Sequence, residues 1–220
     1  MTNPLKKLFF WRNYSTASHT KWWKARSPRI NFENEIKTFN HPHRLVICNF
    51  LRMMNWGTLL EVGFGGGANL ALIAQVFKGR RLCGTEINKE AIEFVKTKFK
   101  GLDARECPVT DIFMSDKGVE VTLTDMVLIY VGPRNIMKAL GELKRVTTNY
   151  ILLCEFHHTN WFKRMWLLIT QGYHSYNYVR LLEKLDFYDI ITYPLSEAQW
   201  PGAKHNQQFR TIIMAKVAKK

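Results

Sequence analysis

Apolar segments alternate with amphipathic segments through the middle of the chain, and this alternation predicts a parallel β-sheet covered by helices on both faces. The run Thr58–Val62 is short and apolar, as a buried strand is. In the segment Lys89–Phe99, Ile92, Val95 and Phe99 instead recur at the spacing of one helix face. The same criteria predict strands at Arg81–Glu86, within Asp103–Val109, at Met126–Tyr130 and at Tyr150–Phe156, and helices at Leu45–Met54, Asn69–Phe77 and Asn135–Val146.

The alternation of strand and helix stops after Phe156. Two helices are predicted in succession, at Trp161–Thr170 and Tyr176–Leu185. Two strands follow, Phe187–Tyr193 and Phe209–Val217, and the connection between them contains Pro and Gly. Neighbouring strands joined in this way predict an antiparallel edge on an otherwise parallel sheet.

Residues 1–44 stand apart because their apolar residues show no clean helical or strand period. The segment is rich in aromatic side chains and carries nine Lys and Arg against two acidic residues. Residues 198–220 carry five basic residues and no acidic one, whereas the middle of the chain is nearly neutral, so the net charge of +14 is concentrated at the two ends. We predict a basic, aromatic N-terminal extension or lid at 1–44 and one domain at 45–220.

A glycine-rich loop follows the first predicted strand. Gly63, Gly65, Gly66 and Gly67 lie between that strand and a helix, where glycine lets a ligand approach the main chain. The helix start offers unpaired N–H groups and a positive dipole end, which suit a carboxylate or a phosphate. The spacing Gly63-x-Gly65-x-x-Ala68 also satisfies the dinucleotide fingerprint, so the loop alone is compatible with S-adenosylmethionine (SAM) and with a nicotinamide cofactor.

Three acidic residues near predicted strand ends narrow this choice. Glu61 stands two residues before the first loop glycine, where a carboxylate would repel a pyrophosphate but can meet the ammonium group of methionine. Glu86 ends the second strand and can accept hydrogen bonds from the ribose hydroxyls of either cofactor. Asp111, beyond the third strand, can accept a hydrogen bond from an adenine amino group while an apolar neighbour covers the ring. Together the three acids favour SAM.

From Thr58 to about Phe156 these features resemble the class I SAM-dependent methyltransferases. The resemblance implies an α/β fold with a Rossmann-like, mostly parallel sheet of seven strands, helices on both faces and an antiparallel last strand. Asp125–Leu128 resembles the fourth-strand segment of the family, whereas Thr147–Asn149 replaces its common Pro-Gly turn. The cofactor-binding residues implied are Glu61, Gly63, Gly65, Gly67, Glu86, Ile87, Asp111 and Ile112.

Acceptor groups in this family lie at the carboxyl ends of the fourth and fifth strands. We therefore predict that the residues following these strands include a general base or another catalytic group. The catalytic candidates are Tyr130, His157 and His158, and the substrate-binding candidates are Glu155, His174 and Tyr176. An isolated histidine is more often an ordinary surface or core residue. A purely structural role is therefore the alternative interpretation of each of these histidines.

The class of methyl acceptor is narrowed mainly by motifs that the sequence lacks. It has no Asn/Asp-Pro-Pro-Tyr/Phe tetrapeptide and no Pro-Cys dipeptide after the fourth strand, which disfavours methylation of DNA bases. We predict O-methylation of a small molecule or of a glycan such as a lipid-linked sugar. The alternatives are an RNA methyltransferase that uses the basic ends, a non-catalytic SAM- or nucleotide-binding module, and an NAD-dependent oxidoreductase.

Partners and location follow from the ends of the chain and from its cysteines. Lys6–Arg12 is similar to an interfacial membrane segment, so 1–44 is predicted to contact an anionic membrane surface or RNA. The four cysteines lack metal-ligand spacing, which predicts reduced thiols, no bound metal and a cytoplasmic protein, peripheral to a membrane at most. No signal peptide and no transmembrane run is expected.

Overall fold

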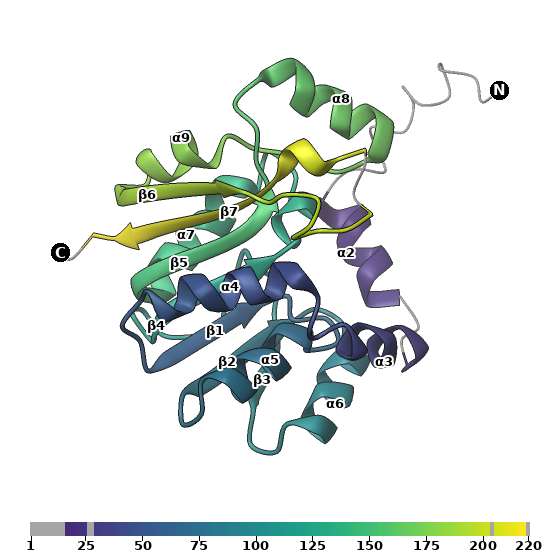
Figure 1. Ribbon diagram of the computed structural model, residues 1–220, viewed down its shortest axis with the longest axis vertical. Helices are drawn as coiled ribbons and strands as arrows, with labels where there is room; N and C mark the ends of the chain where they lie inside the picture. Colours follow the sequence, from purple (N-terminus) through teal and green to yellow (C-terminus); the bar gives the residue numbers. More distant parts are fainter. Residues whose placement is uncertain (1–15, 26–28, 203–204, 219–220) are drawn as a thin grey trace.

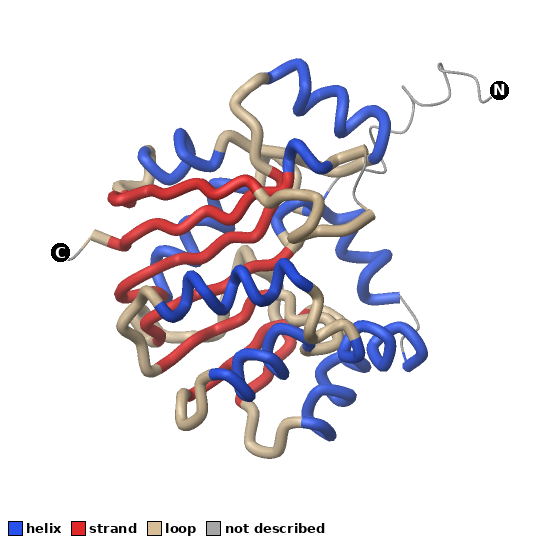
Figure 2. Tube along the Cα trace, in the orientation of Figure 1, coloured by secondary structure: helices blue, strands red, loops and turns tan. Residues whose placement is uncertain are grey.

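The computed structural model describes residues 16–25, 29–202 and 205–218, and it contains one seven-stranded sheet in the order β3-β2-β1-β4-β5-β7-β6. The sheet forms the continuous central layer in Figure 2. β7 is antiparallel to β5 and β6, and the remaining neighbours are parallel. The strands are β1 (Thr58–Val62), β2 (Arg81–Glu86), β3 (Asp103–Glu106), β4 (Val119–Asp125), β5 (Thr147–Phe156), β6 (Phe187–Pro194) and β7 (Arg210–Val217).

Helices cover both faces of the sheet, because side chains alternate between the faces along each strand. Leu59 and Leu152 pack with α4 (Pro42–Arg52) and α5 (Ala68–Val76) on one face. Leu60 and Leu153 pack with α7 (Ile136–Val146) and α9 (Tyr178–Glu183) on the other face. The remaining helices are α2 (Thr16–Ala25), α3 (Arg29–Lys37), α6 (Lys89–Lys98), α8 (Trp161–Gln171) and the short 3-10 helices η2 (Leu128–Tyr130) and η3 (Gln207–Phe209).

The helices α2 and α3 lie beside the sheet, at the end opposite the C-terminus (Figure 1). The sequence pattern had shown no clean period here, yet Phe32 in α3 is buried and its ring lies 6.1 Å from that of Phe94 in α6. Residues 1–15, with the predicted interfacial segment Lys6–Arg12, fall outside the described residues. In the part of the chain that the structure describes, no helix is long and apolar enough to cross a membrane.

The fourth strand differs from the sequence prediction. Met126–Tyr130 is not a strand: β4 ends at Asp125, Met126 has a left-handed φ of 57°, and Leu128–Tyr130 forms η2. The prediction favoured the more apolar run, whereas β4 buries Thr122 and Thr124. The hydroxyl of Thr122 lies 2.5 Å from that of Thr147, so a threonine-containing strand is buried with this hydroxyl paired.

The other end of the sheet agrees with the prediction. β6 and β7 add the predicted antiparallel pair, and the last strand, β7, lies between β5 and β6. The edge is β6, whose exposed side chains explain why it is the less apolar of the two strands.

Candidate cofactor site

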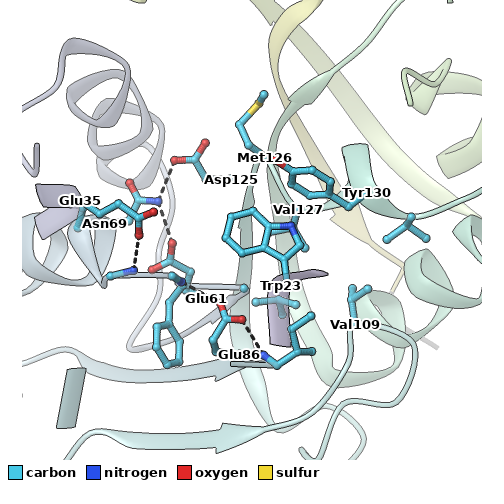
Figure 3. A pocket seen from close by; sticks show the side chains of 18 of the residues that line it. Trp23, Glu35, Glu61, Asn69, Glu86, Val109, Asp125, Met126, Val127 and Tyr130 are labelled. Carbon is cyan, nitrogen blue, oxygen red and sulfur yellow. Dashed lines mark hydrogen bonds between the residues drawn. The ribbon is translucent and has the colours of Figure 1, made fainter. Parts of the chain in front are cut away.

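A cavity of about 310 Å³ opens where β1, β2 and β4 end. The loops after these strands form its floor, and residues of α2, α3 and α4 form the opposite wall. Figure 3 shows that its polar and apolar side chains are segregated. Glu35, Glu61, Asn69 and Asp125 gather on one side, and Trp23, Val109, Met126, Val127 and Tyr130 lie on the other.

The polar side is organised by the amide of Asn69. Its Nδ2 donates to Glu61 Oε1 at 2.8 Å and to Asp125 Oδ2 at 3.0 Å. Because both neighbours are carboxylates, this orientation leaves Oδ1 of Asn69 facing no donor. Among the described residues, none donates to Asn69 Oδ1, Glu61 Oε2 or Asp125 Oδ1, and all three atoms are buried. Three residues that line one side of the cavity therefore each carry a buried acceptor oxygen without a donor among the described residues, which favours a ligand that donates hydrogen bonds.

The two carboxyl groups of this cluster differ in their electrostatics. Burial raises the pKa of Glu61 to about 8, and the hydrogen bond from Asn69 offsets only part of the rise. Burial acts on Asp125 in the same direction, but the charge and hydrogen bond of His43 outweigh it and hold the pKa of Asp125 below its ordinary value. His43 Nε2 lies 2.9 Å from Asp125 Oδ2.

A stack of rings holds His43 in this position. Its Nδ1 lies 2.6 Å from Nδ1 of His41, and its ring stacks on Trp200 with centroids 4.0 Å apart. The guanidinium of Arg210 covers Trp200 at 3.9 Å from the ring centroid. The connection between β6 and β7 thereby closes the cavity beside α4.

The glycine-rich loop is already engaged with carboxylates. Gly65 N donates to Glu86 Oε2 at 3.0 Å, and Gly66 N donates to Glu35 Oε2 at 2.7 Å. The other oxygen of Glu86 accepts from the backbone amides of Ile87 and Asn88. A pyrophosphate at this loop would meet two carboxylates at the amides it needs, so the loop is unsuited to a dinucleotide.

The loop glycines have different tasks, and we expect Gly63→Ala to be the costly substitution. Gly63 has φ 73°, and a Cβ there would lie 2.5 Å from Cγ2 of Val127 on the cavity wall. Gly79 has φ 80° with no atom within 4 Å of a Cβ, so Gly79→Ala isolates the backbone cost of about 1 kcal/mol. Urea unfolding should show a loss for Gly63→Ala of at least twice that of Gly79→Ala; equal losses would contradict close packing of the loop on Val127.

The apolar side is formed where α2 spans the cavity. Asn88 Nδ2 donates to the carbonyl oxygen of Trp23 at 2.8 Å, which ties α2 to the end of β2. The ring centroid of Tyr130 lies 5.3 Å from that of Trp23 and 5.2 Å from that of His19. Lys24 pairs with Glu106 at the end of β3. Helix α2 thus extends from the carboxyl ends of β2 and β3 to Tyr130, which lies in η2 after β4.

The structure separates the predicted cofactor residues into two groups. Glu61, Gly63, Gly65, Glu86 and Ile87 line the cavity. Gly67, Asp111 and Ile112 do not line the cavity. Gly67 caps α5 and packs against Val95, Asp111 is exposed, and Ile112 is buried against α7 with its N–H bonded to Glu142. The wall near them is formed by Cys107, Pro108, Val109 and Thr110.

Of the predicted catalytic residues, Tyr130 lines the cavity and the two histidines do not. His157 Nδ1 accepts from the backbone N–H of Tyr178, and the backbone N–H of His157 donates to the carbonyl oxygen of Phe209. Burial, with His158 and Arg164 nearby, lowers the pKa of His157 to about 4. His158 Nδ1 accepts from the backbone N–H of Asn160 at the start of α8.

The predicted substrate-binding residues pack behind the cavity. His174 and Tyr176 are buried and stack on each other, and the Tyr176 hydroxyl donates to Val131 O at 2.5 Å. Glu155 is fully buried, and its Oε1 accepts from the backbone N–H groups of Val127 and Leu128. Glu155 therefore holds the turn that carries Met126 and Tyr130 into the cavity.

Glu155 also gives a pH-dependent prediction. Burial raises its pKa to about 7, so the folded protein holds this proton more tightly than the unfolded chain does. The stability that Glu155 contributes is present at low pH and is lost as the pH rises towards 7 and above. We expect Glu155→Gln to become more stable relative to the parent chain by up to about 3 kcal/mol between pH 5 and pH 8 in urea titrations. A pH-independent difference would contradict an ionisable Glu155.

The cavity residues that were not among the sequence candidates include Glu35, His43, Arg44, Asn69 and Asp125. The sequence analysis placed Asn69 only at the start of a predicted helix; in the structure Gly67 is the N-cap of that helix, α5, and no side chain caps it. Asp125 had a detectable signal, since it is an acid at the carboxyl end of a strand, but the strand was placed one segment too late. No local signal marks Glu35, His43 or Arg44, which packing brings from the N-terminal helices.

Comparison with known proteins finds similarity to methyltransferases over part of the sequence and over the fold. Residues 60–150 match the family model described as a methyltransferase domain. No curated protein matches the chain in sequence.

Solved structures match the whole fold. A methyltransferase from a Haloferax volcanii complex with the Trm112 methyltransferase activator has a TM-score of 0.62 and 15% identity, covering 88% of this chain and 100% of that one. The CurJ carbon methyltransferase also has a TM-score of 0.62 and 15% identity, covering 99% of this chain and 62% of that one. Geranyl diphosphate C-methyltransferase from Streptomyces coelicolor, solved with S-adenosyl-L-homocysteine, has a TM-score of 0.58 and 14% identity. The match covers 74% of this chain and 70% of that one. The predicted fold class is confirmed.

Proposed function

We propose that this chain is a class I SAM-dependent methyltransferase that binds SAM in the cavity above β1, β2 and β4 and methylates a small, largely apolar acceptor. The observation that carries the proposal is the set of three buried acceptor oxygens on Glu61, Asn69 and Asp125. An ammonium group has three N–H donors and a positive charge, so it complements this set in number and sign.

The rest of the cavity fits the remaining parts of SAM. Arg44 lines the cavity with a buried Nε that has no acceptor among the described residues, and it would pair with the methionine carboxylate. Glu86 uses three of roughly four acceptor positions on backbone amides, which leaves capacity for a ribose hydroxyl. Ile87 and Val109 give the apolar surface that an adenine ring needs. We propose no cofactor role for Asp111 and Ile112.

The chain's own residues would position the acceptor and exclude water. SAM, when bound, would supply a methyl carbon whose bond to sulfur breaks as the acceptor nucleophile bonds to that carbon, with S-adenosylhomocysteine as the leaving group. Tyr130 and Met126 stand at the carboxyl end of β4, and Trp23 closes the cavity over them from α2. Holding the acceptor in line within such an enclosed site is the main source of acceleration in a displacement of this kind. We retain Tyr130 as the catalytic candidate, and residues 16–44 as part of the lid.

The acceptor class follows from the apolar side of the cavity. Trp23, Val109, Met126, Val127 and Tyr130 present little polar surface, which favours a small molecule with an aromatic or aliphatic body over a nucleic acid backbone. We propose a hydroxyl as the acceptor atom, and the similarity to two carbon methyltransferases makes an activated carbon the alternative to test.

The proposal is tested by calorimetry followed by a product assay on the full chain. We expect SAM and S-adenosylhomocysteine to bind, NAD not to bind, and S-adenosylhomocysteine to accumulate with a phenol or aliphatic alcohol pool. Binding of NAD in place of SAM would overturn the cofactor assignment. Product formed only with transfer RNA would overturn the acceptor class, and SAM binding without product on any pool would indicate a non-catalytic module.

A further inference from the structure

Helix α8 presents an apolar face to solvent. Its four large exposed side chains lie on one side of the helix, given about 3.6 residues per turn. They are Trp161, Phe162, Trp166 and Ile169, with exposed fractions of 56%, 75%, 48% and 46%. Leu167, on the opposite side, is fully buried in a cluster with Ile129, Phe156 and Phe209. The helix is therefore anchored to the domain while its aromatic side chains remain in water, an arrangement that marks an interaction surface.

The surroundings of this face are basic. The sequence of α8 contains Lys163 and Arg164 and no acidic residue. A groove beside Trp166 is lined by Gln171, His205, Asn206 and Arg210, again without an acid. Charge complementarity therefore calls for an anionic partner.

We propose that α8 docks the protein on an anionic phospholipid surface, with Phe162 and Trp166 entering the headgroup boundary and Lys163 in contact with lipid phosphates. Aromatic side chains beside lysine and arginine on one short helix are the composition of an interfacial helix. One short apolar face gives weak, reversible binding, so a second contact is needed. The sequence Lys6–Arg12, which lies outside the described residues, has three basic and three aromatic residues and so the same chemistry.

The position of α8 relates this docking to the cavity. The helix follows the carboxyl end of β5, and Figure 1 shows it standing outside the sheet layer. Just past its end, the ring of Tyr173 lies 5.8 Å from that of Tyr130 in the cavity wall. Docking through α8 would bring the apolar side of the cavity towards the lipid, from which an apolar acceptor would enter. This consequence rests on the proposed function, whereas lipid binding itself does not.

The test is vesicle flotation of the full chain with phosphatidylcholine vesicles, with and without phosphatidylglycerol. We expect binding to the anionic vesicles that weakens with salt. Phe162→Ser combined with Trp166→Ser should lower the partition coefficient about tenfold, and Lys163→Glu should lower it by a smaller factor. The matched control is Tyr188→Ser combined with Ile191→Ser on β6, which also removes two large exposed apolar side chains and should leave binding unchanged.

Thermal unfolding and SAM titration of each variant separate docking from folding and from the cofactor site. Unchanged vesicle binding in the α8 variant with a native melting curve would overturn the proposal, as would equal losses in the β6 control. Absence of vesicle binding by the parent chain would also overturn it. Loss of a dimer or of single-stranded RNA binding in the α8 variant, without vesicle binding by the parent chain, would assign the face to that partner instead.

Discussion

Glu61→Gln is expected to weaken SAM binding by about a hundredfold, because a charge-assisted hydrogen bond and one of the buried acceptors are lost together. In the parent chain Oε1 of Glu61 accepts from Asn69, and Oε2 is buried with no donor among the described residues. A glutamine would have to turn its amide NH₂ towards either Asn69 Nδ2 or the ligand ammonium. Either choice places two donors against each other in a buried site.

The same carboxyl group makes the affinity depend on pH. With a pKa of about 8, Glu61 is protonated in the free protein at pH 7 and must release that proton to pair with a cation. The affinity for S-adenosylhomocysteine should therefore rise from pH 5.5 to pH 7.5, at most about tenfold per unit, below the range where an α-amino group deprotonates. Calorimetry in two buffers of different ionisation enthalpy should detect the released proton.

Glu61→Gln should remove both the proton release and the pH dependence of binding. Glu93→Gln is the matched control, because Glu93 is exposed on α6 and does not line the cavity. Parent-chain affinity that is flat with pH, together with unchanged affinity in Glu61→Gln, would contradict an ammonium site at Glu61. The three buried acceptors would then belong to a different ligand.

The part of the site that the sequence predicted is the part built locally. Glu61, Gly63, Gly65 and Glu86 all lie within one strand–loop–helix–strand unit, where spacing alone brings acids and glycines to the carboxyl edge of a parallel sheet. The Rossmann-like fold class could be predicted for the same reason, since alternating strands and helices admit few topologies.

The part that was missed depends on packing between distant segments. His43 and Arg44 reach the cavity because α4 packs across one face of the sheet, and Glu35 reaches Gly66 because α3 packs on α5 and α6. Asp125 was overlooked because Thr122 and Thr124 make β4 less apolar than the segment after it. A threonine can still be buried in a central strand where its hydroxyl is paired, as that of Thr122 is with Thr147.

The predicted histidine pair shows the limit of inference from strand ends. His157 does follow β5 at the carboxyl edge, as expected, but its N–H continues the pairing with β7 by donating to Phe209 O. That pairing turns the side chain towards Tyr178, whose ring stacks on it at 6.3 Å. The direction of a side chain after a strand depends on the next strand pairing, which a single sequence does not encode locally.

Glu86→Gln is expected to lower both the affinity for SAM, by about a hundredfold, and the free energy of unfolding, by about 2 kcal/mol. The two oxygens of Glu86 accept from Gly65, Ile87 and Asn88 in the parent chain. An amide NH₂ in place of either oxygen faces a backbone N–H, so at least one buried donor loses its partner. If Gly65 loses it, the glycine loop and the ribose contact are disturbed together.

Glu106→Gln is the matched control at the end of the adjacent strand β3. Glu106 is partly exposed and pairs with Lys24 and Lys89, so its removal should change stability by less than about 1 kcal/mol and leave SAM affinity nearly unchanged. Titration calorimetry and urea unfolding of both variants separate ligand binding from folding. Parent-like affinity in Glu86→Gln combined with weakened affinity in Glu106→Gln would move the ribose from the end of β2 to the end of β3, and with it the orientation of the cofactor across the sheet.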